Sequence, residues 1–209
     1  MSELYGKISA PFKRHTEGKL RNKLDEGNWA RPEFEALADL HWEWTEKVDG
    51  TNVRVTWDGY KVAYGGRTDD AQMPTALVEV LRETFPEELL EQQFHATPAV
   101  LYGEGFGAKI QNGGRYGARP MFILFDVLVD GRWWLRRDDL HNVSNGFKIE
   151  VVPLKTYASI LEAIELVRGN VKSEWGDFPV EGLVGKPPCG IVARDGDRLL
   201  VKIKTKDFR

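Results

Sequence analysis

The chain has one cysteine, few histidines and no long apolar run. Cys189 cannot form an intramolecular disulfide and has no Cys or His neighbour at metal-ligand spacing, so we expect a small, half-buried packing residue. No window approaches the roughly 20 apolar residues of a membrane span, and the N-terminus lacks a signal-peptide stretch. These absences predict an intracellular protein with no membrane contact. A histidine-based metal site or catalytic triad is not supported, because the histidines are scattered: His15, His41, His95 and His141.

A strong charge of one sign is also missing. The formal net charge is -3, so nucleic-acid binding would need a local basic patch rather than a global field. The 209 residues are 42% hydrophobic and 29% charged, which is ordinary globular composition. No internal repeat, low-complexity tract or linker interrupts them. The sequence therefore predicts one continuous domain over residues 1–209.

Turn signals and apolar periodicity predict strands joined by hairpins, with helices gathered between them. Helices are predicted at 32–40, 74–84, 86–94, 136–145 and 159–168. Strands are predicted at 42–48, 52–57, 60–66, 99–102, 121–129, 132–135, 149–153, 180–184, 190–193 and 198–204. The run 121–129 is so apolar that we expect it to form, with 132–135, the central strand pair of the core. This order predicts an α+β fold rather than a doubly wound parallel sheet.

Residues 1 to 31 are polar and are predicted to be irregular. They contain a cluster of basic residues, for which two interpretations remain open: a solvated surface segment, or a surface that contacts the phosphates of a nucleic acid. The cluster consists of Lys13, Arg14, Lys19, Arg21 and Lys23.

Lys47 lies at the end of a predicted strand and is followed closely by Asp49 and Gly50. A Lys-x-Asp-Gly pattern arises by chance in many proteins, so this pattern alone does not identify Lys47 as a nucleophile. A free lysine has a pKa near about 10.4 and is mostly protonated, so a nucleophilic lysine needs neighbouring cations or a metal that favour its neutral amine. Charged residues at other strand positions favour this hypothesis for Lys47: Glu104, Glu181, Lys202 and Lys204.

Two lysines alternate in the last predicted strand. Lys202 and Lys204 share one face, while Val201 and Ile203 share the other. One interpretation is an exposed sheet edge that lysines protect from aggregation. The other is a pair of cations that bind a phosphate and help to lower the pKa of a third amine.

Other candidate ligand-binding residues lie in the middle of the chain. The glycine-rich stretch 102–117 is neither a Walker loop nor a dinucleotide fingerprint. Its glycines would let the backbone approach a sugar, with Glu104 accepting from ribose hydroxyls, or it forms a flexible loop. Phe125 fits a core residue or a ring that stacks on a purine, and Asp126 beside it needs a partner. Arg67 fits a phosphate clamp or a surface ion pair.

The chain resembles the RNA ligases of the phage RNA ligase 2-like class, within the superfamily of covalent nucleotidyltransferases. The resemblance lies in six motifs that follow one another in order: EKVDGTN, GGRTD, LYGEGFG, LFDV, VEGLV and VKIKTKDF. It covers nearly the whole chain, from FKR near residue 12 to the closing KDF. It implies the nucleotidyltransferase (ligase adenylation domain) fold: two antiparallel β-sheets with flanking helices and the nucleotide pocket between them.

The resemblance also implies a reaction. Lys47 would attack the α-phosphate of ATP, release pyrophosphate and carry AMP as a phosphoramidate. AMP would pass to an RNA 5′-phosphate, and a 3′-hydroxyl would displace it to form the phosphodiester. Lys202 and Lys204 would bind the α-phosphate, while Asp49 and Glu181 would hold Mg²⁺, with Mn²⁺ as an alternative.

Further residues would contact the nucleotide by resemblance. Glu46 would contact adenine, Glu104 the ribose and Phe125 the purine face. Asn52 and Arg67 would position phosphates or the acceptor end of the RNA.

RNA ends are the expected substrate. Many relatives carry a further domain that helps to bind RNA, and DNA ligases and capping enzymes usually need an OB-fold domain. We expect no appended C-terminal or OB-fold domain after Arg209. RNA ends would be bound either by the chain's own surface, such as the basic cluster, or by a nucleic-acid-binding partner protein. Another covalent nucleotidyltransferase, of the DNA-ligase or capping type, and a non-catalytic sensor of nucleotides or RNA ends are the alternatives.

Overall fold

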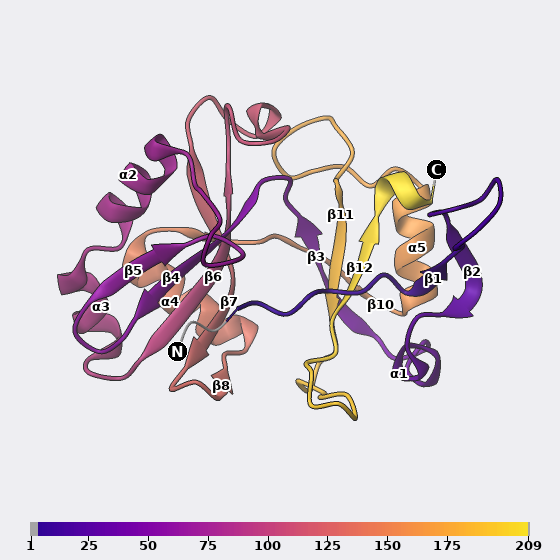
Figure 1. Ribbon diagram of the computed structural model, residues 1–209, viewed down its shortest axis with the longest axis horizontal. Helices are drawn as coiled ribbons and strands as arrows, with labels where there is room; N and C mark the ends of the chain where they lie inside the picture. The colour runs from indigo at the N-terminus through magenta and orange to yellow at the C-terminus, as the bar shows by residue number, and fades with distance from the viewer. Residues whose placement is uncertain (1–3, 209) are drawn as a thin grey trace. The chain divides into compact units, whose positions relative to one another are not determined.

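The computed structural model describes residues 4–208, which form two compact units. The first unit contains residues 4–5 and 49–152, and the second contains residues 6–48 and 153–208. Each unit is built on an antiparallel sheet with helices against it (Figure 1). The α+β prediction is therefore confirmed. Among the described residues, no helix combines the length and the apolar character needed to cross a bilayer.

The first unit contains a sheet with the strand order β5-β4-β6-β7-β8. Its central strand, β6, pairs antiparallel with β4 and β7, and the short β9 pairs parallel with β7. The strands are β4 (Thr51–Trp57), β5 (Val62–Gly65), β6 (Ala99–Phe106), β7 (Met121–Val129), β8 (Trp133–Trp134) and β9 (Glu150–Val151).

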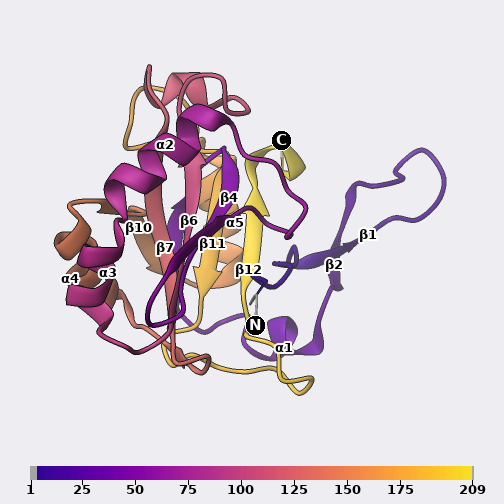
Figure 2. The ribbon, with the colours of Figure 1, turned by 60° about the vertical axis from the view of Figure 1, so that its left-hand side comes forward.

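Three helices belong to the first unit: α2 (Thr75–Thr84), α3 (Glu87–Phe94) and α4 (Arg137–Phe147). Leu77 and Leu81 of α2 and Leu90 of α3 are fully buried, as the helical spacing predicts. Figure 2 shows α2 and α3 along one face of the sheet. Asn52 of β4 is opposite Glu104 of β6, so their side chains share one face of this sheet.

The second unit contains a sheet with the strand order β10-β3-β11-β12. Its strands are β3 (Trp42–Lys47), β10 (Leu154–Ala158), β11 (Gly182–Lys186) and β12 (Val201–Lys204). The unit also contains the hairpin of β1 (Phe12–Arg14) and β2 (Leu24–Trp29), the helices α1 (Pro32–Ala36) and α5 (Ile160–Arg168), and a 3₁₀ turn, η2 (Thr205–Asp207). A second 3₁₀ turn, η1 (Gly113–Arg115), lies in the first unit.

One face of the second sheet packs against α5. Trp42 and Trp44 of β3 and Ile203 of β12 are fully buried in a cluster with Ile160 and Ile164 of α5. The helix begins with a capping box, in which Ser159 and Glu162 satisfy each other's backbone N–H groups. The other face of this sheet is therefore left for Lys47, Lys202 and Lys204.

The strand predicted at 99–102 is longer than expected, and the flexible-loop interpretation does not hold for residues 103–106. Strand β6 continues from Tyr102 through Phe106, because Gly103 and Gly105 allow close packing within the sheet. A Cβ atom on Gly103 would lie 2.2 Å from the ring of Phe122. The glycines therefore serve strand packing here.

The predicted central pair is also wrong. Strand β8 has two residues and lies at the edge of the sheet, where the side chain of Trp133 is 64% exposed. The central partner of β7 is β6, since their register runs from Ala99 opposite Val129 to Phe106 opposite Met121. An apolar run identifies a buried strand, but it does not identify the partner.

Smaller differences occur in the second unit. The helix predicted at 32–40 ends at Ala36, because the carbonyl of Leu37 accepts from the indole of Trp42 at 3.0 Å. The strand predicted at 190–193 is reduced to one bridge between Val192 and Arg198. Cys189 is exposed rather than half-buried.

The N-terminal prediction of irregular structure is wrong in part. Within residues 4–31, β1 and β2 form a hairpin with an irregular register, beside β12 in Figure 2. Residues 1–3 lie outside the described part of the chain.

Substitution Gly103→Ala tests the packing of β6. The new methyl group would lie 2.2 Å from Phe122 and 2.4 Å from the carbonyl oxygen of Ile123, and the backbone oxygen has little room to move. We expect the free energy of unfolding in a urea titration to fall by about 1–3 kcal/mol. Gly114→Ala is the control, because nothing lies within 4 Å of its added Cβ. Equal stability of the two variants would contradict this account.

Candidate functional site

The register of the second sheet brings three motif residues together. Gly182, the first residue of β11, is opposite Lys47 of β3 on one side and Lys204 of β12 on the other. Glu181 precedes Gly182 and therefore lies between the two lysines. A Cβ on Gly182 would lie 2.0 Å from the carbonyl oxygen of Ile203, so only glycine fits this position.

Glu181 contacts both lysines. The distance from Lys47 Nζ to Glu181 Oε2 is 2.5 Å, and that from Lys204 Nζ to Glu181 Oε1 is 3.0 Å. The three side chains are between 19% and 26% exposed, so the cluster is partly screened from water yet accessible to a ligand. The carboxylate reduces the repulsion between the two ammonium groups.

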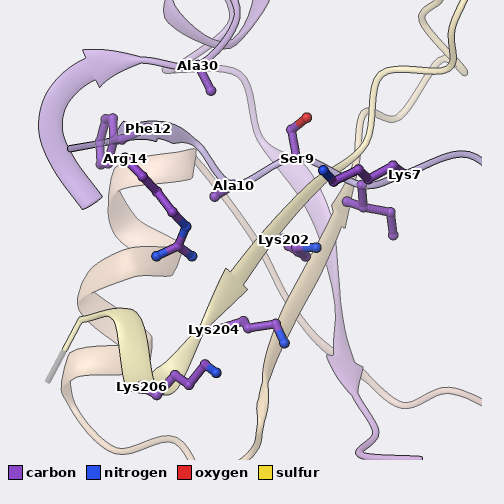
Figure 3. A pocket seen from close by; sticks show the side chains of 10 residues that line it. Lys7, Ser9, Ala10, Phe12, Arg14, Ala30, Lys202, Lys204 and Lys206 are labelled. Carbon is purple, nitrogen blue, oxygen red and sulfur yellow. The ribbon is translucent and has the colours of Figure 1, made fainter. Parts of the chain in front are cut away.

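Lys202 and Lys204 share one face of β12, as predicted, while Val201 and Ile203 are buried on the other. β12 is the last strand of its sheet, which agrees with the edge interpretation in part. The edge is covered, however, because the N–H of Lys202 donates to the carbonyl of Ser9 at 2.9 Å. Figure 3 shows both lysines lining a pocket beside the N-terminal segment.

Glu46 lies on the opposite face of β3 from Lys47 and is almost fully buried. Its Oε2 accepts from the N–H of Glu174 at 3.1 Å and lies 3.8 Å from Lys155 Nζ. No donor within residues 4–208 reaches Oε1. Burial raises the pKa of the Glu46 carboxyl above its ordinary value of 4.5, and hydrogen bonds from Ser173 and Glu174 oppose this rise.

Asp49 belongs to the first unit and is already engaged there. Its Oδ2 accepts from Asn112 Nδ2 at 2.9 Å and lies 3.9 Å from Arg115, while its N–H donates to the hydroxyl of Tyr116 at 3.2 Å. The glycine after it, Gly50, lies against the backbone of β6, where a Cβ would be 2.3 Å from a carbonyl oxygen. These contacts fix the Asp-Gly pair on the first sheet.

Asn52 and Glu104 are direct partners across β4 and β6, so their side chains share one face of the first sheet. The Oδ1 atom of Asn52 is buried, and no donor in the described part of the chain reaches it. A buried acceptor of this kind is suited to a hydroxyl or amine of a ligand.

Phe125 is the extra residue of a β-bulge, because Tyr102 is opposite Asp126 and Gly103 is opposite Leu124. Its ring is half-buried and contacts the ring of Tyr5 at 5.1 Å between centroids. The hydroxyl of Tyr5 also donates to Asp126 Oδ2 at 2.7 Å. The predicted partner of the buried acid is thus present, and it comes from the N-terminal segment.

Arg67 is exposed in the turn after β5. The buried arginine nearby is Arg54 of β4, which donates to the carbonyl of Gly66 at 2.7 Å and pairs with Asp69 at 2.7 Å. Arg54 therefore holds the turn that carries Arg67.

Each unit gathers a set of the predicted residues. Lys47, Glu181 and Lys204 are in contact in the second unit, where Lys202 lines the same pocket as Lys204. Asn52 and Glu104 are strand partners in the first unit. Sequence reasoning missed the residues that support them: Tyr5, Lys7, Arg54, Asn112, Arg115, Lys155 and Lys206. A charged residue among the apolar residues of a strand, such as Arg54, was a signal in the sequence for a buried ion pair. Tyr5 and Lys7 gave no such signal, because Tyr5 contacts Asp126 and Lys7 lines a pocket with Lys202, both far along the chain. Within residues 4–208, no group of three His, Cys, Asp or Glu side chains forms a metal cluster.

Comparisons with known proteins identify a family and a fold. A family model described as RNA ligase matches residues 40–204. A lysine mutant of Naegleria gruberi RNA ligase with AMP and Mn is similar, with a TM-score of 0.68 and 19% identity over 100% of this chain and 60% of that chain. A second lysine mutant of that ligase, with ATP and Mn, has a TM-score of 0.67 and 20% identity over 99% of this chain and 62% of that chain. The same ligase with PPi has a TM-score of 0.66 and 20% identity over 98% of this chain and 62% of that chain.

The match to the family model covers most of the chain. At 19–20% identity, the likeness to solved structures shows the fold. The chain spans about 60% of the length of these ligases. No curated protein matches the chain.

Substitution Glu46→Gln tests the effect of burial on this carboxyl. The raised pKa means that the folded protein binds a proton that the unfolded chain has lost, so stability falls as pH rises from 4.5 through the folded pKa. Above that window the buried charge costs stability. We expect the Tm of Glu46→Gln to exceed that of the original protein at pH 8, and this advantage to shrink near pH 4.

The control is Glu79→Gln, which changes an exposed residue of α2. Its Tm should follow that of the original protein at both pH values. If Glu46→Gln lowers the Tm at pH 8 more than at pH 4, the hydrogen bonds to the carboxylate outweigh its burial.

Proposed function

Because the chain belongs to the RNA ligase family, we propose that it is an ATP-dependent RNA ligase that joins an RNA 5′-phosphate to a 3′-hydroxyl. One observation supports this function most directly: Glu181 holds Lys47 and Lys204 together at the end of the second sheet. A lysine at a strand end beside a second cation and an acid is suited to attack a phosphate.

In the first step, the neutral amine of Lys47 attacks the α-phosphorus of ATP. A nitrogen–phosphorus bond forms, the bond from the α-phosphorus to the leaving oxygen breaks, and pyrophosphate departs. Lys47 loses its proton before the attack, and Glu181 is the carboxylate within hydrogen-bond reach to accept it, at 2.5 Å. Lys202 and Lys204 stabilise the charge that develops on the α-phosphate oxygens.

In the second step, an oxygen of the RNA 5′-phosphate attacks the same phosphorus. The nitrogen–phosphorus bond breaks, the proton returns to Lys47, and RNA-adenylate forms. In the third step, the 3′-hydroxyl attacks the 5′-phosphate and loses its proton, and AMP leaves with the bridging oxygen. Each displacement places the attacking and leaving groups roughly in line.

The nucleotide contacts remain proposals for the named residues. We assign Glu46 to adenine, and the unpartnered Oε1 supports this, since an exocyclic amine is a donor. Glu104 is assigned to the ribose and Phe125 to the purine face. Asn52 and Arg67 are assigned to phosphates or to the acceptor end.

A divalent cation fits part of this site. Mg²⁺ is usually held by one or two carboxylates, substrate phosphates and water, and Glu181 offers one such carboxylate beside Lys47. Mg²⁺ or Mn²⁺ would neutralise phosphate charge there. Asp49 of the first unit is also assigned to a divalent cation, through water, because Asn112 and Arg115 engage its carboxylate directly.

Substitution Lys47→Ala tests the nucleophile. With radiolabelled ATP and Mg²⁺ and no RNA, we expect covalent labelling of the protein to fall by at least about a thousandfold, because the attacking amine is gone. Lys61→Ala is the control, since it removes an exposed lysine of the first unit. Full labelling of the Lys47→Ala variant would show that another residue carries AMP.

Nucleotide and substrate choice form a separate test. We expect labelling from ATP rather than GTP, and joining of 5′-phosphorylated RNA but not of 5′-hydroxyl RNA, in a panel of single-stranded and nicked RNA and DNA. Labelling from GTP alone would favour a capping-type enzyme. ATP binding that never gives a covalent label would favour a non-catalytic sensor.

A further inference from the structure

A basic pocket lies on the outer face of β12, in the second unit (Figure 3). Its volume is about 340 Å³, which falls within the range of roughly 300–1,000 Å³ for ligand pockets. Its polar and charged lining residues come from three segments: Lys7, Ser9, Arg14, Lys202, Lys204 and Lys206. Five cations around one pocket favour an anionic ligand.

The pocket is built by fixed backbone rather than by chance proximity of surface lysines. Ser9 forms a parallel bridge with Val201, and its carbonyl accepts from the N–H of Lys202 at 2.9 Å. This contact holds the segment that carries Lys7 beside β12. Arg14 is held by Asp207, at 2.6 Å, and by the carbonyl of Asn22, at 2.6 Å. Figure 3 shows Arg14 extending from β1 toward Lys202 and Lys204 of β12.

The charges around the pocket are not balanced. Asp207 pairs with Arg14, and Glu181 pairs with Lys204. Within the described residues 4–208, Lys7 and Lys206 make no ion pair, so two exposed ammonium groups adjoin the hollow without a carboxylate. The chain as a whole has a net charge of -3, so this cationic excess is local.

The pocket is continuous with the proposed nucleophile. Lys204 lines it and also contacts Glu181, which contacts Lys47. In an in-line displacement, the group that attacks the α-phosphorus of lysine-AMP stands opposite Lys47. That group is the 5′-phosphate of the RNA, which carries up to two negative charges and needs cations beyond those that bind the α-phosphate.

We propose that this pocket binds the terminal 5′-phosphate of the RNA, with Lys7, Arg14 and Lys206 as its specificity-determining cations. The assignment rests on the proposed function and extends it to the recognition of the RNA end. It also separates Arg14 from the rest of the basic cluster seen in the sequence, because Lys13, Lys19, Arg21 and Lys23 do not line the pocket.

Binding of two RNA oligonucleotides tests the pocket. They share one sequence and carry either a 5′-phosphate or a 5′-hydroxyl, and fluorescence anisotropy measures their affinity for the full chain without ATP. The test variant is Lys7→Ala/Lys206→Ala, which removes the two cations without an ion pair. The matched control is Lys13→Ala/Lys23→Ala, which removes the same charge from exposed residues outside the pocket.

We expect the original protein to prefer the 5′-phosphorylated RNA. The test variant should bind it about tenfold more weakly and lose the preference, and its log–log salt slope should fall by about one. The control should bind both RNAs somewhat more weakly and keep the preference. Lys7→Arg/Lys206→Arg should restore the preference, because arginine keeps the charge.

Two results would overturn the proposal. The first is an unchanged preference for the 5′-phosphate in the test variant; if that variant also loses binding of inorganic pyrophosphate, the pocket is assigned to the leaving group of ATP. The second is an equal loss of affinity for both RNAs that exceeds the loss in the control, which indicates contact with internal phosphates. The binding assay contains no ATP, so its outcome is independent of the labelling experiment. A protein that prefers 5′-phosphorylated RNA but never forms lysine-AMP would contradict the ligase function and still support the pocket.

Discussion

The contact of Glu181 with two lysines is the interaction on which the site depends. Lys47 and Lys204 would repel each other as neighbouring ammonium groups, and the carboxylate between them offsets that repulsion at 2.5 and 3.0 Å. The register of β11 makes this arrangement possible, because Gly182 lies between both lysines and leaves their face open. A phosphate that binds beside Glu181 would meet two cations already in position.

The first unit presents its polar residues by a similar use of glycine. Gly103 and Gly105 let α2 and Phe122 pack closely on one face of β6, so Glu104 is directed to the other face, opposite Asn52. The bulge in β7 then turns Phe125 toward Tyr5. Helix packing on one side of a strand thus fixes which side chains are available for a ligand on the other.

Local patterns in the sequence identified most of the strands and helices. The limits of β7 and the position of α5 agree with the prediction, because each depends on the apolar pattern within one segment. The partner of β7 and the length of β6 were missed. Pairing is decided by contacts between distant segments, and the glycines of β6 look like loop residues until Phe122 is placed against Gly103.

The sequence alone determined the chemical types of the site: a lysine followed by Asp-Gly, a glutamate before β11, and two lysines that alternate on the last strand. Alternation has a fixed period, so it assigned Lys202 and Lys204 to one face without a structure. Only the tertiary structure decided that Glu181 contacts Lys47 and Lys204, and that Lys7 and Arg14 join the pocket. Those contacts depend on strand register and on a segment folded back over almost 200 residues, which no local pattern encodes.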